Sequence, residues 1–168
     1  MNKKRDILFG YSCTPAWGLN GIDPGGFSIE IDRSGLIKYK TYIFDCIEQK
    51  ERTAQLSLNT IQKINTILEN NAAIIKKIKR YLDNGSCDGV CNQFNFAGKV
   101  ITAYNISLSN EESLLKYNFE YYEVYVKNIK QENIVTSIFN IIVNELQDEL
   151  KAEGIELDLF GCKYFDAG

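Results

Sequence analysis

The chain has 168 residues, a formal net charge of −3 at pH 7 and no histidine. Histidine is the usual general base, the usual partner of a nucleophilic Ser or Cys, and the commonest metal ligand. Its absence excludes Ser-His-Asp and Cys-His catalysis, histidine-ligated metal centres and imidazole pH switches. The length fits a single domain over residues 1–168, and an apolar fraction of 45% is enough for a core without disulfide support.

The charge pattern narrows the classes of partner. Basic residues are scattered among acidic ones, which argues against nucleic acid. The run from Lys76 to Arg80 is interpreted as the solvated face of a helix. No stretch approaches the roughly 18 apolar residues of a membrane span, so no membrane partner is expected. The composition, rich in Ile and Asn, is typical of an A/T-rich bacterial genome.

The N-terminal segment is predicted to be a first β-strand in a cytoplasmic protein rather than a signal peptide. Asp6 interrupts the basic start, and the apolar run after it covers only Ile7 to Phe9.

A β-hairpin is predicted from Phe27 to Lys40, where apolar and polar residues alternate along both arms. A three-residue loop over 33–35 pairs Ile31 with Ile37 and keeps the apolar side chains on one face, whereas a two-residue loop mixes the faces. The three-residue loop therefore predicts a core face made of Ile29, Ile31, Ile37 and Tyr39.

From Leu58 the apolar spacing changes to three and four, which predicts a helix running to about Leu82. A second hairpin follows over 93–104. Gly98 at the first central position of its turn would pair Phe96 with Ile101, but a three-residue loop fits as well, and the register stays open.

The segment 114–128 has the composition of a strand but the charge spacing of a helix. On a helix, Lys116 pairs with Glu120 and Glu123 pairs with Lys127, so we predict a helix. A further helix is predicted over 132–153 and a last strand over 155–159. The order of these strands and helices along the chain predicts an α+β fold. It consists of a mainly antiparallel sheet of two hairpins plus terminal strands, packed against about three helices.

Five cysteines are present, at Cys13, Cys46, Cys87, Cys91 and Cys162. Zinc sites and redox pairs usually place two residues between their cysteines, but the pair Cys87 and Cys91 has three, and no second pair exists. We therefore expect reduced thiols, with no metal and no cofactor.

Two features are candidate binding sites. The loop 13–26 holds Trp17, the single tryptophan, together with Asp23, and a connection of this length is often functional. Tyrosines recur every fourth residue along the helix predicted for 114–128, and tyrosine is enriched at interfaces. These are Tyr117, Tyr121 and Tyr125.

No motif identifies a reaction. The favoured hypothesis is a non-enzymatic cytoplasmic protein that binds a protein partner. One form is an immunity protein that neutralises a toxin domain, because an acidic surface speeds association with a basic target. Two alternatives stay open: a histidine-free enzyme that uses Cys13, Cys87 or a Tyr/Asp pair in a cleft, and a structural subunit of a homo-oligomer.

Overall fold

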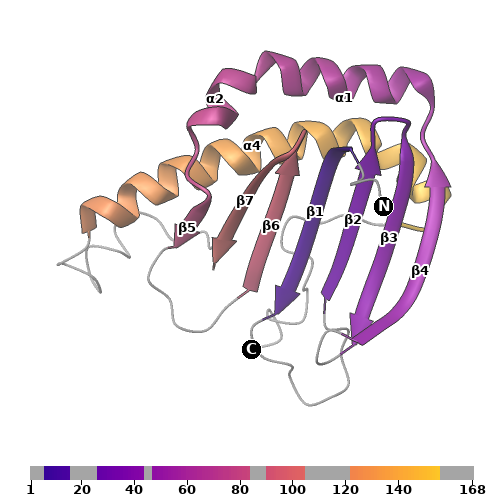
Figure 1. Ribbon diagram of the computed structural model, residues 1–168, viewed down its shortest axis with the longest axis horizontal. Helices are drawn as coiled ribbons and strands as arrows, with labels where there is room; N and C mark the ends of the chain where they lie inside the picture. The colour runs from indigo at the N-terminus through magenta and orange to yellow at the C-terminus, as the bar shows by residue number, and fades with distance from the viewer. Residues whose placement is uncertain (1–5, 16–25, 44–46, 84–89, 105–121, 156–168) are drawn as a thin grey trace.

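A computed structural model describes residues 6–15, 26–43, 47–83, 90–104 and 122–155. Seven strands form one sheet in the order β4-β3-β2-β1-β6-β7-β5. Figure 1 shows helix α4 crossing behind the strands and helix α1 running along the end of the sheet. The predicted α+β class, with a mainly antiparallel sheet and three helices, is confirmed.

The first strand in the sequence lies at the centre of the sheet. β1 (Ile7–Pro15) pairs antiparallel with β2 (Gly26–Asp32) on one side and with β6 (Val90–Phe96) on the other. The remaining strands extend the sheet outward on both sides; they are β3 (Leu36–Ile43), β4 (Ile47–Gln55), β7 (Lys99–Tyr104) and β5 (Tyr81–Asp83), which pairs parallel with β7. Neither β4 nor β5 was predicted from the sequence.

The first hairpin has the predicted register. Ile31 pairs with Ile37, Glu30 pairs with Lys38, and Gly35 in the loop has a φ of +83°. The Asp32 carboxylate fixes the turn, because its Oδ1 accepts the backbone N–H groups of Ser34 and Leu36, both at 3.0 Å. The predicted core face is confirmed: its three isoleucines are buried and Tyr39 packs against the core.

The second hairpin resolves a register that the sequence left open. Phe96 pairs with Lys99, so the turn consists of Ala97 and Gly98. Their φ values are 50° and 98°, as a type I′ turn requires at both central positions. The pairing of Phe96 with Ile101 is therefore wrong; Ile101 pairs with Phe94.

The single helix predicted from Leu58 to about Leu82 is interrupted at Asn71 and ends at Lys77. α1 (Leu58–Asn70) is followed by a break at Asn71 and a short α2 (Ala72–Lys77). The Asn71 side chain donates to the carbonyl of Ile67 at 2.7 Å, a local bond of the kind that competes with regular helix geometry. Leu82 lies in β5, so the basic run is a helix end followed by a strand and is not one helical face.

The two helices predicted near the C-terminus are one. α4 (Tyr122–Ala152) runs without interruption over 31 residues. Helix is confirmed for 122–128, while 114–121 lies outside the described residues, as does nearly all of the strand predicted over 155–159. The predicted apolar stripe of α4 is buried; it consists of Val135, Ile138, Ile142, Leu146 and Leu150.

An aromatic cluster joins α4 to the centre of the sheet. The ring of Phe139 on α4 lies 4.6 Å from Tyr11 and 5.5 Å from Phe94, centroid to centroid. Tyr11 also donates its hydroxyl to Oδ1 of the buried Asn92 at 2.6 Å. These contacts place the core between α4 and one face of the sheet, and leave the opposite face polar.

A hydrogen bond and an ion pair join α1 to α4 near the N-terminus of α1. Ser57, the N-cap of α1, donates its backbone N–H to Oε1 of Glu149 on α4 at 2.7 Å, and an ion pair joins Lys63 to Glu145 at 3.1 Å. Partial desolvation raises the pKa of Glu149, but hydrogen bonds from Thr60 and from the backbone and hydroxyl of Ser57 outweigh it, so the pKa lies below its ordinary value.

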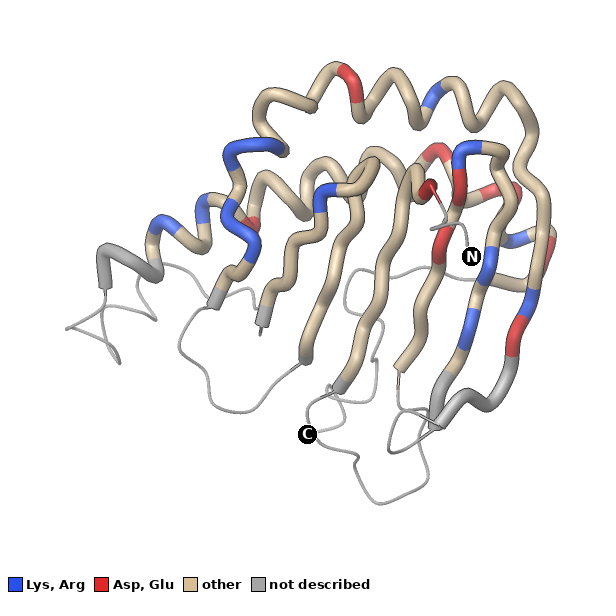
Figure 2. Tube along the Cα trace, viewed as in Figure 1, with Lys and Arg blue, Asp and Glu red and all other residues tan. Residues whose placement is uncertain are grey.

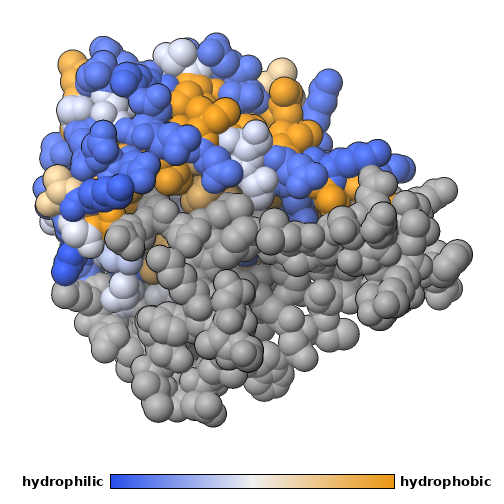
Figure 3. Space-filling model, turned by 180° about the vertical axis from the view of Figure 1, so that it is seen from behind, coloured by the Kyte–Doolittle hydropathy of each residue, from blue (hydrophilic) through white to orange (hydrophobic). Residues whose placement is uncertain are grey.

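Seen from the helix side (Figure 3), the described surface carries small hydrophobic areas separated by hydrophilic ones. None of the helices in the described ranges combines the length and the apolar character needed to cross a lipid bilayer.

Candidate functional site: a polar hollow on the sheet

Strand β1 turns a row of small residues toward the face of the sheet opposite α4. Side chains alternate along a strand. Because Phe9, Tyr11 and Cys13 point into the core, the residues between them point the other way. These are Gly10, Ser12 and Thr14.

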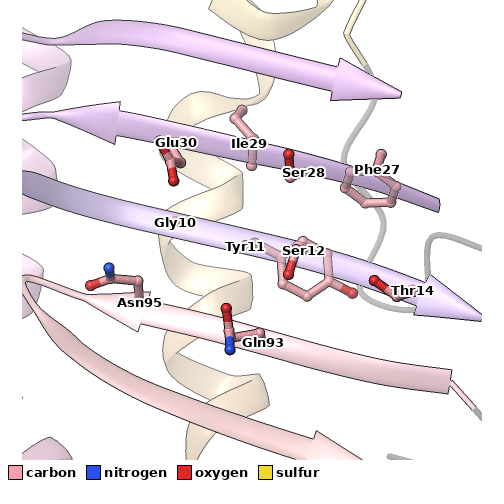
Figure 4. Close-up of a pocket in the computed structure, with 10 residues that line it drawn as sticks. All are labelled: Gly10, Tyr11, Ser12, Thr14, Phe27, Ser28, Ile29, Glu30, Gln93 and Asn95. Atoms are coloured by element: carbon pink, nitrogen blue, oxygen red, sulfur yellow. The ribbon is translucent and has the colours of Figure 1, made fainter. Parts of the chain in front are cut away.

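The two neighbouring strands complete the site from both sides of β1. Ser12 pairs with Ser28 on β2 and with Gln93 on β6, so three polar side chains form one row across the strands. The next row is formed by Glu30, Gly10 and Asn95. Figure 4 shows these side chains around the middle of β1, with α4 on the far side of the sheet.

Together these residues surround an open hollow of about 390 Å³, called the polar hollow below. Gly10, in its lining, is buried and contributes no side chain. A Cβ atom built on Gly10 would lie 3.2 Å from the Cβ of Asn95, so even alanine there needs Asn95 to give way. The hollow is thus open where Gly10 has no side chain between the longer Glu30 and Asn95 on the neighbouring strands.

The lining is rich in hydrogen-bonding groups and poor in charge. Serine and threonine hydroxyls and the amides of Gln93 and Asn95 can each donate and accept. Glu30 supplies the single carboxylate in the lining, and its cross-strand neighbour is Lys38. Two of the amides already form a hydrogen bond within the protein. Gln93 Nε2 donates to Thr102 Oγ1 at 3.4 Å, and Asn95 Oδ1 accepts the Gly98 N–H at 2.8 Å.

The binding residues predicted from the sequence do not belong to this site as described. Trp17, Asp23, Tyr117 and Tyr121 lie outside the described residues. Tyr125 lies in the first turn of α4, but its side chain is outside what the structure describes. They stay predictions.

Sequence reasoning missed the polar hollow altogether. A signal was present, because small residues occupy every second position of β1 at Gly10, Ser12 and Thr14. The partner strands could not be identified from the sequence.

The two described thiols lie on opposite faces of the sheet, and Cys91 is paired with Thr14 on the face that carries the polar hollow. Cys13 is 0% exposed and faces the core, opposite Asn92, so it is not placed to act as a nucleophile at the surface. Cys91 is half-buried, and burial raises the pKa of its thiol. Cys46, Cys87 and Cys162 are outside the described residues. Within the ranges that the structure describes, no group of three or more Cys, Asp or Glu side chains could hold a metal ion.

No protein-family model matches the chain, and no curated protein matches it in sequence. The chemistry of the polar hollow and of the surfaces around it is therefore the basis for a functional assignment.

Proposed function

We propose that the protein is a non-enzymatic binding protein that receives a segment of a protein partner on the face of the sheet opposite α4. The observation that carries the proposal is the polar hollow, whose hydroxyls and amides lie in two rows across three strands. Hydroxyl and amide side chains suit a peptide ligand, because each can bond either a backbone N–H or a backbone C=O.

The rigidity of the site supports binding. Its residues stand on central strands whose other face packs against α4 through Tyr11 and Phe94. A site held in this way loses little conformational freedom when a ligand enters, which favours affinity.

The carboxylate of Glu30 suggests that the partner presents a positively charged side chain to the polar hollow. A carboxylate at the border of a mostly neutral hollow favours a Lys or Arg side chain from the partner, through a charge-assisted hydrogen bond. An immunity protein that neutralises a basic toxin domain is one function of this type, and it remains a proposal alongside other protein partners.

The test is affinity capture with matched variants. Ser12→Trp fills the polar hollow, whereas Thr53→Trp places the same side chain on the exposed β4 strand, outside the hollow. Both variants are first checked for wild-type melting temperatures. A protein retained by the wild type and by Thr53→Trp, but lost with Ser12→Trp and confirmed by titration with purified partner, supports the proposal.

Two outcomes contradict it. A partner held equally well by Ser12→Trp binds elsewhere. If no partner is retained and the purified chain forms a defined oligomer that Ser12→Trp leaves intact, a structural subunit replaces a binding protein as the best account.

A further inference from the structure

Basic side chains gather at one end of the molecule, where α2, the segment before β5 and the first turns of α4 meet (Figure 2). The backbone N–H of Lys79 donates to Oε1 of Gln131 at 2.8 Å, which brings the segment before β5 against α4. We call this surface the basic end. It consists of Lys76, Lys77, Lys79, Arg80, Lys99, Lys127 and Lys130.

The cations of the basic end have no acidic partners among the described residues. Elsewhere, Arg33 pairs with Asp6, and Lys40 pairs with Glu51. None of the seven cations at the basic end forms an ion pair with another described residue. Seven cations without an ion pair among the described residues repel one another, and an anionic partner would relieve that repulsion.

An apolar hollow of about 220 Å³ opens beside these charges, between the helices and the second hairpin. Its walls include the buried side chains of Leu68, Ile75 and Phe96, and Lys76 and Lys99 line it as well. The hollow thus combines an apolar interior with two lysines in its lining.

We propose that the basic end binds an acidic segment of a protein partner, and that one apolar side chain of that segment enters the hollow beside Lys76 and Lys99. The cations attract and orient the segment, and burial of the apolar side chain adds to the affinity. Two exposed residues add apolar contact area around the cations: Ile74 is 46% exposed and Tyr81 is 66% exposed.

The apolar hollow favours a protein segment over nucleic acid. Phosphates interact with lysines at any spacing, but a nucleic acid backbone carries no apolar side chain that could enter a cavity walled by Leu68 and Ile75. An acidic peptide with a leucine or phenylalanine offers both.

This binding would be independent of the polar hollow. The two sites share no lining residue, although β6 contributes Gln93 and Asn95 to the polar hollow and Phe96 to the apolar one, so each can be changed by its own substitution. A Ser12→Trp variant with normal binding at the basic end separates failure of one proposal from failure of the other.

The direct test is fluorescence titration of the full chain with synthetic probes. The first probe is a labelled peptide with one Leu between two runs of Glu. A second probe has Ser in place of the Leu, a third has Gln in place of every Glu, and a fourth is a DNA oligonucleotide. We expect the first peptide to bind most tightly, with affinity that falls as salt rises, and each altered peptide to bind roughly tenfold more weakly.

Variants assign the binding to the basic end. Lys76→Glu together with Lys99→Glu should weaken the first peptide by at least about tenfold, and Ala72→Trp should abolish the preference for Leu over Ser while salt-dependent binding remains. Lys151→Glu, in the last turn of α4, repeats one charge change at a distant place and should have little effect. The proposal is overturned if DNA binds more tightly than the peptide, if Lys151→Glu weakens binding as much, or if no peptide binds at low salt.

Discussion

Gly10 on β1 and Asn95 on β6 face each other so closely that a Cβ atom on Gly10 would lie 3.2 Å from the Cβ of Asn95. Asn95 cannot easily move away, because its Oδ1 accepts the Gly98 N–H at 2.8 Å in the turn of the second hairpin. Gly10, in the lining of the polar hollow, is thus linked through Asn95 to the conformation of a turn.

This contact predicts that Gly10→Ala destabilises the fold even though the methyl group is small. Crowding against a held neighbour should lower the free energy of unfolding by about 1 kcal/mol, measured by urea denaturation. Ser12→Ala, at a half-exposed position on the same strand, should change it by less than about 0.5 kcal/mol. Equal stability of both variants would show that Asn95 adjusts freely.

Gly35, in the turn of the first hairpin, lies against Ile61 of α1. Gly35→Ala should therefore lower the free energy of unfolding more than Gly10→Ala does. Its φ of +83° disfavours any side chain, and a Cβ atom there would collide with the Ile61 side chain. We expect a loss of about 2 kcal/mol or more in a thermal or urea melt. Gly98→Ala is the matched control, because it has a φ of +98° but no atom within 4 Å of the added Cβ. If Gly35→Ala lowers stability no more than Gly98→Ala does, the added Cβ atom does not collide with Ile61.

Substitutions of the buried, hydrogen-bonded residues Tyr11 and Asn92 should have coupled effects on stability. Asn92 Nδ2 has no hydrogen-bond partner among the described residues, so Tyr11→Phe leaves the whole Asn92 amide buried and unsatisfied. The expected loss is about 1–3 kcal/mol. Adding Asn92→Leu should restore part of it, because two apolar side chains need no partner. A double-mutant cycle measures the coupling, and purely additive effects would contradict it.

The lowered pKa of Glu149 predicts a pH-dependent link between α1 and α4. A carboxyl with a depressed folded-state pKa stabilises the protein above its unfolded pKa, near 4.3, and this contribution is lost as pH falls through the folded-state value. Glu149→Gln should therefore cost up to about 1 kcal/mol at pH 7 and progressively less below about pH 4.

Urea denaturation across this pH range checks the prediction, with Asp148→Asn as a control that removes one negative charge from an exposed neighbouring position. A Glu149→Gln penalty that stays constant from pH 7 to about pH 3 would mean that the carboxylate charge is not what stabilises the contact with Ser57.

The spacing of apolar residues along the sequence correctly predicted the first hairpin and the buried face of α4. The first hairpin follows from alternation and turn parity, which bring Ile31 opposite Ile37. The buried stripe of α4 follows from helical spacing, as at Val135 and Ile142.

The elements that were missed depend on other forces. The break at Asn71 comes from a side-chain bond to the carbonyl of Ile67. β4 carries the charged run from Glu48 to Arg52 and shows no apolar alternation, which is common in a strand at the edge of a sheet.

The polar hollow was beyond sequence reasoning for a related reason. The small residues of β1 repeat at every second position, but their neighbours Ser28 and Gln93 come from strands far apart in the chain. Strand order decides which side chains meet, and it is set by the packing of the whole sheet against α4.

The side-chain amide signals of Gln93 and Asn95 in a nitrogen-15 NMR spectrum would show whether the polar hollow is a recognition surface. Both amides line the hollow. On titration with the partner recovered by capture, we predict that these two signals shift more than the side-chain amide signal of Gln62, which lies on the exposed side of α1. Unchanged signals from Gln93 and Asn95 in a saturated complex would contradict the account.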